Sequence, residues 1–139
     1  MPAKNALASS TRPVDEKITI NIGCVDLGQI DLLVQEGFYA NRTDLIRTAI
    51  RNQLTTHAAA VREVVSRKTL VLGMQHYTAA DLQAVKAAGE MLQIRVLGLA
   101  TIADDVTPKL ALATIESLTV LGALHASPAV KAALRDRIG

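Results

Sequence analysis

The sequence predicts a mixed α/β protein built from two structural units. Polar and apolar residues alternate strictly over residues 17–22, which is the pattern of a strand with one buried face. Up to Leu54 the apolar residues then recur at spacings of three and four, as in amphipathic helices. Beyond residue 68 a Val-Leu-Gly core occurs three times, ending at Gly73, Gly98 and Gly122. A strand with two helices, followed by three β-α repeats, is therefore the expected architecture.

The first strand separates two kinds of side chain. Its successive residues point to opposite faces. Three β-branched residues share one face and three polar residues share the other: Ile18, Ile20 and Ile22 against Lys17, Thr19 and Asn21. One face therefore requires a hydrophobic core, and the other requires polar partners.

Two helices should follow this strand. Gly37 is placed to end the first helix in a left-handed conformation. Asn41 is a favourable N-cap for the second, and Asp44 stands where it would complete a capping box. The apolar positions define the buried faces: Leu27, Ile30, Leu33 and Val34 on the first helix, and Leu45, Ile46, Ala49, Ile50 and Leu54 on the second.

About forty residues cannot enclose a core alone. We therefore expect the strand to pair with its symmetry mate as a two-stranded antiparallel ribbon over four helices. Dimerisation would then be part of folding. The predicted dimer core consists of Ile18, Ile20, Ile22, Ile46 and Ile50.

The order strand, helix, turn, helix, with G-F-Y-A-N-R-T-D-L-I-R-x-A-I-R across the turn, resembles the ribbon-helix-helix family of DNA-binding transcriptional regulators, of the Arc, MetJ and CopG type. The resemblance covers residues 16–54. It implies that the outward side chains of the ribbon enter the major groove of double-stranded DNA. It also implies that a DNA phosphate sits on the free amides at the start of the second helix, near Asn41, Arg42 and Thr43. Helix-terminus electrostatics supports that position independently.

The three outward residues have suitable chemistry for contacting base edges. Lys17 can donate to guanine, Asn21 can pair bidentately with adenine, and Thr19 offers a hydroxyl and a methyl group. The alternative is that they form only the solvated side of a surface ribbon. With the following helices in place, we favour the DNA-contacting interpretation.

Composition restricts the remaining function classes. A single cysteine, Cys24, excludes a disulfide framework within the chain and fits a reducing cytoplasm. A net charge of +2 in 139 residues argues against general polyanion binding, so any DNA affinity needs a local patch. No apolar run reaches the ~18 residues of a membrane span, and no signal peptide is evident. We expect a soluble cytoplasmic protein, associated with the nucleoid when it binds DNA.

The expected organisation has four parts. They are a disordered arm over residues 1–14, a DNA-binding domain over 15–54, a helical linker over 55–67 and a repeat domain over 68–139. In the repeat domain, Thr78, Thr107 and Ser127 each stand at a helix start. The strands are apolar on both faces, which predicts parallel strands covered by helices in a solenoid-like stack, with Gly73, Gly98 and Gly122 side by side.

Three uses of the repeat domain are open. It could join DNA-bound dimers into larger assemblies through unprotected edge strands. It could bind an effector, as nickel-responsive members of the family do, but only His76 and His125 are available as ligands, so we expect no metal and no cofactor. It could hold a toxin, although its hydrophobicity predicts folding without a partner.

We expect no enzymatic activity, because the sequence has no glycine-rich phosphate loop, serine elbow or Cys/His pairing at catalytic spacing. The function expected is that of a homodimeric, sequence-specific DNA-binding repressor, with further self-assembly through the repeats. The alternative is a filament or scaffold protein whose repeats polymerise and whose N-terminal domain anchors it to DNA. Plasmid-partition and antitoxin proteins of the same fold remain open as well.

Overall fold

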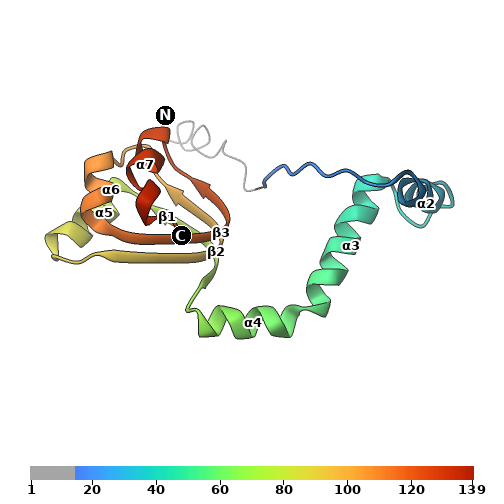
Figure 1. Ribbon diagram of the computed structural model, residues 1–139, viewed down its shortest axis with the longest axis horizontal. Coiled ribbons are helices and arrows are strands. Elements are labelled where there is room, and N and C mark those ends of the chain that lie inside the picture. The colour runs from blue at the N-terminus through green and yellow to red at the C-terminus, as the bar shows by residue number, and fades with distance from the viewer. Residues whose placement is uncertain (1–14) are drawn as a thin grey trace, which may run out of the picture. The chain divides into compact units, whose positions relative to one another are not determined.

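The computed structural model describes residues 15–139, which form two compact units (Figure 1). The described residues divide into Asp15–Val64 and Val65–Gly139. The expected disordered arm over residues 1–14 lies outside the described residues. Among the described residues, no helix has the length and apolar character needed to cross a membrane.

The N-terminal unit contains the two helices that the sequence predicts. α2 spans Cys24–Gln35 and α3 spans Arg42–Thr56. The residues that precede them, 16–23, have no regular secondary structure. A ribbon strand takes its hydrogen bonds from a second strand, so the predicted strand over residues 17–22 has no ladder in a single chain.

The turn between α2 and α3 follows the glycine signal. Gly37 has φ +85°, and its N–H donates to the carbonyl of Val34 at 3.1 Å, while Phe38 N–H donates to the carbonyl of Leu33 at 3.0 Å. This pair of bonds is the Schellman motif, which satisfies the last carbonyls of a helix. The prediction that Gly37 ends the first helix is confirmed.

The linker is a separate helix rather than a continuation of α3. α3 ends at Thr56, His57 is its C-cap, and α4 spans Ala58–Arg67. α4 itself ends in a second Schellman motif. The N–H of Thr69 donates to the carbonyl of Ser66, and the N–H of Leu70 donates to the carbonyl of Val65. Thr69 occupies the left-handed position with φ +52°, a conformation in which glycine is usual.

The C-terminal unit is a three-stranded parallel sheet with the order β1-β2-β3, as predicted. Each strand is followed by a helix. In chain order the elements are β1 (Val71–Tyr77), α5 (Ala79–Ala87), β2 (Leu92–Ile102), α6 (Pro108–Thr114), β3 (Ile115–His125), α7 (Pro128–Ala133) and the 3-10 helix η1 (Arg135–Arg137).

The three helix starts in this unit are those predicted from their capping residues. The hydroxyl of Thr78 accepts from the N–H of Asp81, whose carboxylate accepts from the N–H of Thr78, so the capping box is complete. Thr107 and Ser127 cap α6 and α7, each ahead of a proline at the first helical turn.

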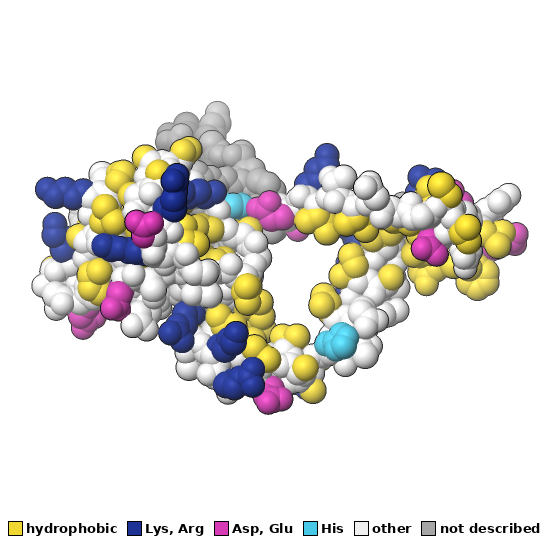
Figure 2. Space-filling model, viewed as in Figure 1, with side chains coloured by type: hydrophobic (Ala, Val, Ile, Leu, Met, Phe, Trp, Pro, Cys, Tyr) yellow, Lys and Arg dark blue, Asp and Glu magenta, His cyan; other side chains and the backbone are white. Residues whose placement is uncertain are grey.

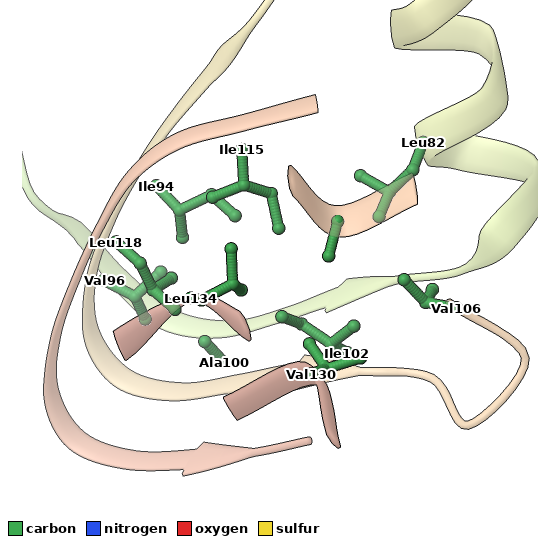
Figure 3. Close-up of a cluster of buried hydrophobic side chains, with 11 residues drawn as sticks. Leu82, Ile94, Val96, Ala100, Ile102, Val106, Ile115, Leu118, Val130 and Leu134 are labelled. Carbon is green, nitrogen blue, oxygen red and sulfur yellow. The ribbon is translucent and has the colours of Figure 1, made fainter. Parts of the chain in front are cut away.

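The core lies between one face of the sheet and the helices α5, α6 and α7. Figure 3 shows the strands curving around the buried side chains. The buried hydrophobic residues are Leu82, Ile94, Val96, Ala100, Ile102, Val106, Ala111, Ile115, Leu118, Val130 and Leu134. The three helices all contribute to this one core and lie on the same face of the sheet. Right-handed crossovers between strands in sequential order put every helix on the same face, and covering both faces needs a reversal of strand order.

The three repeat glycines lie side by side, as predicted. Gly73 pairs with Gly98, and Gly98 pairs with Gly122. Their φ angles are +126°, +141° and +122°, which only glycine adopts without strain. In Figure 3, β2 bends sharply between Val96 and Ala100, the stretch that contains Gly98. The glycine column therefore marks the bend of the sheet.

Candidate nucleic-acid interface

The N-terminal segment exposes an unusual number of large apolar side chains. Ile18 is 76% exposed, Ile20 66% and Ile22 36%. Figure 2 shows hydrophobic side chains gathered over this segment and the helix that follows it. Within the described part of the N-terminal unit, α2 and α3 contain no buried residue. A single chain therefore leaves the hydrophobic face of this unit without a core.

The three residues predicted to contact bases lie on the same segment. Lys17, Thr19 and Asn21 are all exposed. They alternate with the isoleucines, so any extended conformation that turns the isoleucines inward turns these polar side chains outward.

The start of α3 is capped by side chains. The Asn41 side chain accepts from the N–H of Asp44 at 2.8 Å, as expected for an N-cap. The Asp44 carboxylate accepts from the N–H of Ala40 at 3.0 Å, not from that of Asn41. The predicted capping box is therefore shifted by one residue. Asn41 is almost fully extended, with φ −163° and ψ 177°, whereas the complete box at Thr78 has φ −99°.

The guanidinium of Arg42 is engaged within the chain. Its Nε donates to one carboxylate oxygen of Asp31 at 2.7 Å and its Nη2 donates to the other at 2.8 Å. This bidentate pair joins α2 to the first turn of α3. The hydrogen bond from Arg42 lowers the pKa of Asp31, and the same bond raises the pKa of Arg42. Both side chains are exposed, so the pair contributes little stability and mainly positions α2 against α3.

The first amides of α3 remain available to a ligand. Asp44 N–H is used by Asn41, and Leu45 N–H donates to the Asn41 carbonyl at 3.3 Å. The amides of Arg42 and Thr43 have no acceptor among the described residues. At this predicted phosphate position, backbone donors are therefore free, while the Arg42 side chain is already paired. Sequence analysis missed that pairing, because nothing local to Asp31 or Arg42 predicts a contact across the turn.

The remaining residues of the predicted dimer core lie on α3. Ile46 is half-buried and Ile50 is exposed. Together with the three isoleucines of the N-terminal segment, they leave an apolar surface on one unit. Such a surface is characteristic of an element that folds against a partner.

The two histidines considered as metal ligands are separated by the middle strand. The register His76, Thr101, His125 places a threonine between them. No group of three or more metal-ligating side chains occurs in residues 15–139.

The family comparison covers nearly the whole chain. The model of the ribbon-helix-helix transcriptional regulator family matches residues 13–131. The chain belongs to this family. The match extends from the N-terminal segment into α7, so both units are part of the family pattern, whereas the sequence resemblance was confined to residues 16–54. No curated protein and no solved structure gives a significant match. As a ribbon-helix-helix regulator, the protein falls in a class that binds DNA and is typically dimeric.

Proposed function

We propose that the protein is a homodimeric transcriptional repressor that binds a specific double-stranded DNA sequence through a β-ribbon in the major groove. The observation that carries the proposal is the exposure of Ile18, Ile20 and Ile22 in alternation with three polar residues. Each buried residue of this kind contributes about 1.5–3 kcal/mol. A partner chain that covers them would gain enough to drive association.

Dimerisation would create the DNA-contacting surface. Two copies of residues 17–22, paired antiparallel, would bury the isoleucines on the helices and present six polar side chains on the opposite face. Lys17, Thr19 and Asn21 of each copy would contact base edges. A two-stranded ribbon fits the width of the major groove, so the readout would be direct.

Phosphate contacts would fix the orientation of the ribbon. The free amides of Arg42 and Thr43 point from the positive end of the α3 dipole, which favours an anion. Asn41 would hold this helix start in place through its cap on Asp44. Arg42 would act mainly through its backbone, because Asp31 already occupies its guanidinium.

The C-terminal unit would raise the assembly order. Joining dimers on repeated half-sites makes binding cooperative and more specific than one dimer achieves. Repression follows if the occupied sites overlap a promoter. A scaffold function would instead give open-ended growth with protein concentration, which light scattering distinguishes from a closed assembly.

The decisive experiment is selection of DNA fragments by the purified full-length protein, followed by affinity measurements on the selected site and on random DNA. Asn21→Ala should weaken binding to the selected site by about 1–3 kcal/mol and leave random DNA almost unaffected. Asn52→Ala, an exposed asparagine of α3, is the matched control and should change neither affinity. Equal losses of Asn21→Ala on both DNAs would remove Asn21 from the set of base-contacting residues.

A further inference from the structure

The face of the sheet opposite the helices carries an ordered apolar patch. The strand register aligns its residues in two rows across the three strands. The rows, named here the outer patch, are Leu72, Leu97 and Leu121, followed by Met74, Leu99 and Ala123.

The outer patch is open in the single chain. Leu72 is 69% exposed, Met74 67% and Leu121 52%. The hydrophobic core lies on the other face of the sheet, and none of the six residues belongs to it. The patch contains no polar or charged side chain. Polar residues stand only at its two ends, with Arg95 and Thr119 before it and His76, Thr101 and His125 after it.

The size of the patch restricts the kind of partner it can hold. Three strands about 4.8 Å apart and two rows about 7 Å apart give an area of roughly 200 Å² per copy. A stable interface between independent proteins needs about 800 Å² per partner. The outer patch is too small to recruit a freely diffusing protein, and it suits a partner that is already held nearby.

A second copy of this chain is such a partner. A dimer of N-terminal units carries two C-terminal units, and a tether of this kind gives an effective concentration in the millimolar range. The patch is also self-complementary, since two flat apolar sheet faces pack together at a separation of about 10 Å. Pairing through the edge of β3 is less accessible, because Ile138 bridges Leu118 and Gly139 N–H donates to the Leu118 carbonyl.

We propose that the outer patch packs against the outer patch of a second copy, so that two C-terminal units associate through the open faces of their sheets. This inference rests on the proposed dimer and assembly function, for which it names the contact surface. The partner copy belongs either to the same dimer, where the tether holds it nearby, or to a neighbouring dimer, which presents two such patches at once.

Cysteine cross-linking of the full-length protein tests the contact itself. In a Cys24→Ser background, Leu97→Cys puts a thiol on the middle strand, near any two-fold axis that relates the two patches. A bis-maleimide about 10 Å long should link two copies. Lys86→Cys, on the exposed surface of α5, is the matched control and should link about tenfold more slowly. Adding Leu121→Glu to Leu97→Cys should slow linking to the control rate, because the carboxylate would be buried without a partner.

Equal linking rates for Leu97→Cys and Lys86→Cys would overturn the contact, whatever the size of the assembly. The mass of the unlinked protein by analytical ultracentrifugation is a separate readout. A tetramer that Leu121→Glu converts to a dimer places the contact between dimers. A wild-type dimer whose Leu97→Cys variant links rapidly places the contact within one dimer. That result retains the inference and refutes higher-order assembly. A tetramer that persists in Leu121→Glu, with slow linking, refutes the inference and retains the assembly.

Discussion

The glycine column in the C-terminal sheet gives a prediction with an internal control. Gly98 and Gly73 have similar backbone conformations, with φ +141° and +126°. Substitution by alanine forces either residue into a conformation that costs about 1–3 kcal/mol. The two positions differ in their surroundings. A Cβ at Gly98 would overlap the carbonyl oxygen of Gly73 and lie 3.0 Å from its carbonyl carbon, whereas a Cβ at Gly73 would have no atom of residues 15–139 within 4 Å.

The overlap decides the size of the effect. The new methyl group can be accommodated only if β1 and β2 move apart, which lengthens their ladder hydrogen bonds. Overpacking of this kind costs about 1–3 kcal/mol. We therefore expect Gly98→Ala to lower the free energy of unfolding by about 2–6 kcal/mol, and Gly73→Ala by only the conformational part. The difference between the two variants, about 1–3 kcal/mol, isolates the steric contact.

Urea denaturation of the full-length protein measures this difference. The chain contains two tyrosines and no tryptophan. In a Tyr39→Phe background the fluorescence therefore reports only Tyr77, which packs against the core of the C-terminal unit. If Gly98→Ala shows no cooperative unfolding transition while Gly73→Ala is folded, the prediction also holds, with a larger destabilisation than expected. Equal destabilisation of the two variants would refute the close-approach argument and leave only backbone conformation.

Three further predictions concern the N-terminal unit and the linker. Ile20→Lys should abolish dimerisation, because it places a charge in the shared core and burying that charge costs several kcal/mol of desolvation free energy. A stable dimer of this variant in sedimentation would show the strand register to be wrong. Arg42→Gln should raise the pKa of Asp31 towards its ordinary value in a carboxyl NMR titration. The stabilisation from the depressed pKa is present above the ordinary carboxyl pKa and is lost as pH falls through the lowered Asp31 pKa. The free energy of unfolding of the variant should therefore depend less on pH between these two pKa values than that of the wild type. An unchanged Asp31 titration would contradict the pairing. Thr69→Gly should raise the free energy of unfolding by about 1 kcal/mol through relief of left-handed strain, and a decrease in thermal stability would show that the hydroxyl contacts outweigh the strain.

Local signals predicted the element ends well. Gly37, Asn41 and Thr78 each end or begin a helix as expected, because their effects depend on neighbouring backbone groups alone. The parallel strands and their glycine register also followed from the spacing of the repeats. These features need no information from distant parts of the chain.

The features that could not be predicted depend on distant groups. The Asp31–Arg42 pair spans a turn, and its geometry follows from how α2 and α3 pack. The one-sided helix layer follows from crossover handedness, which apolar strands do not encode. The ribbon strand depends on backbone hydrogen bonds to another molecule. The contact of its polar face, including Lys17, with base edges is therefore a proposal.

Thr69 follows α4 with its hydroxyl beside Arg95, whose Nη1 donates to the Lys68 carbonyl at 3.2 Å and to Thr69 Oγ1 at 3.3 Å. The middle strand thus anchors the entry to the sheet. Leu70 also bonds to the carbonyl of Val65. Recombinant fragments of the C-terminal unit should therefore begin no later than Ala58. A fragment that begins at Lys68 would lack the carbonyls of Val65 and Ser66, which accept from the N–H groups of Leu70 and Thr69. The start of β1 would then fray.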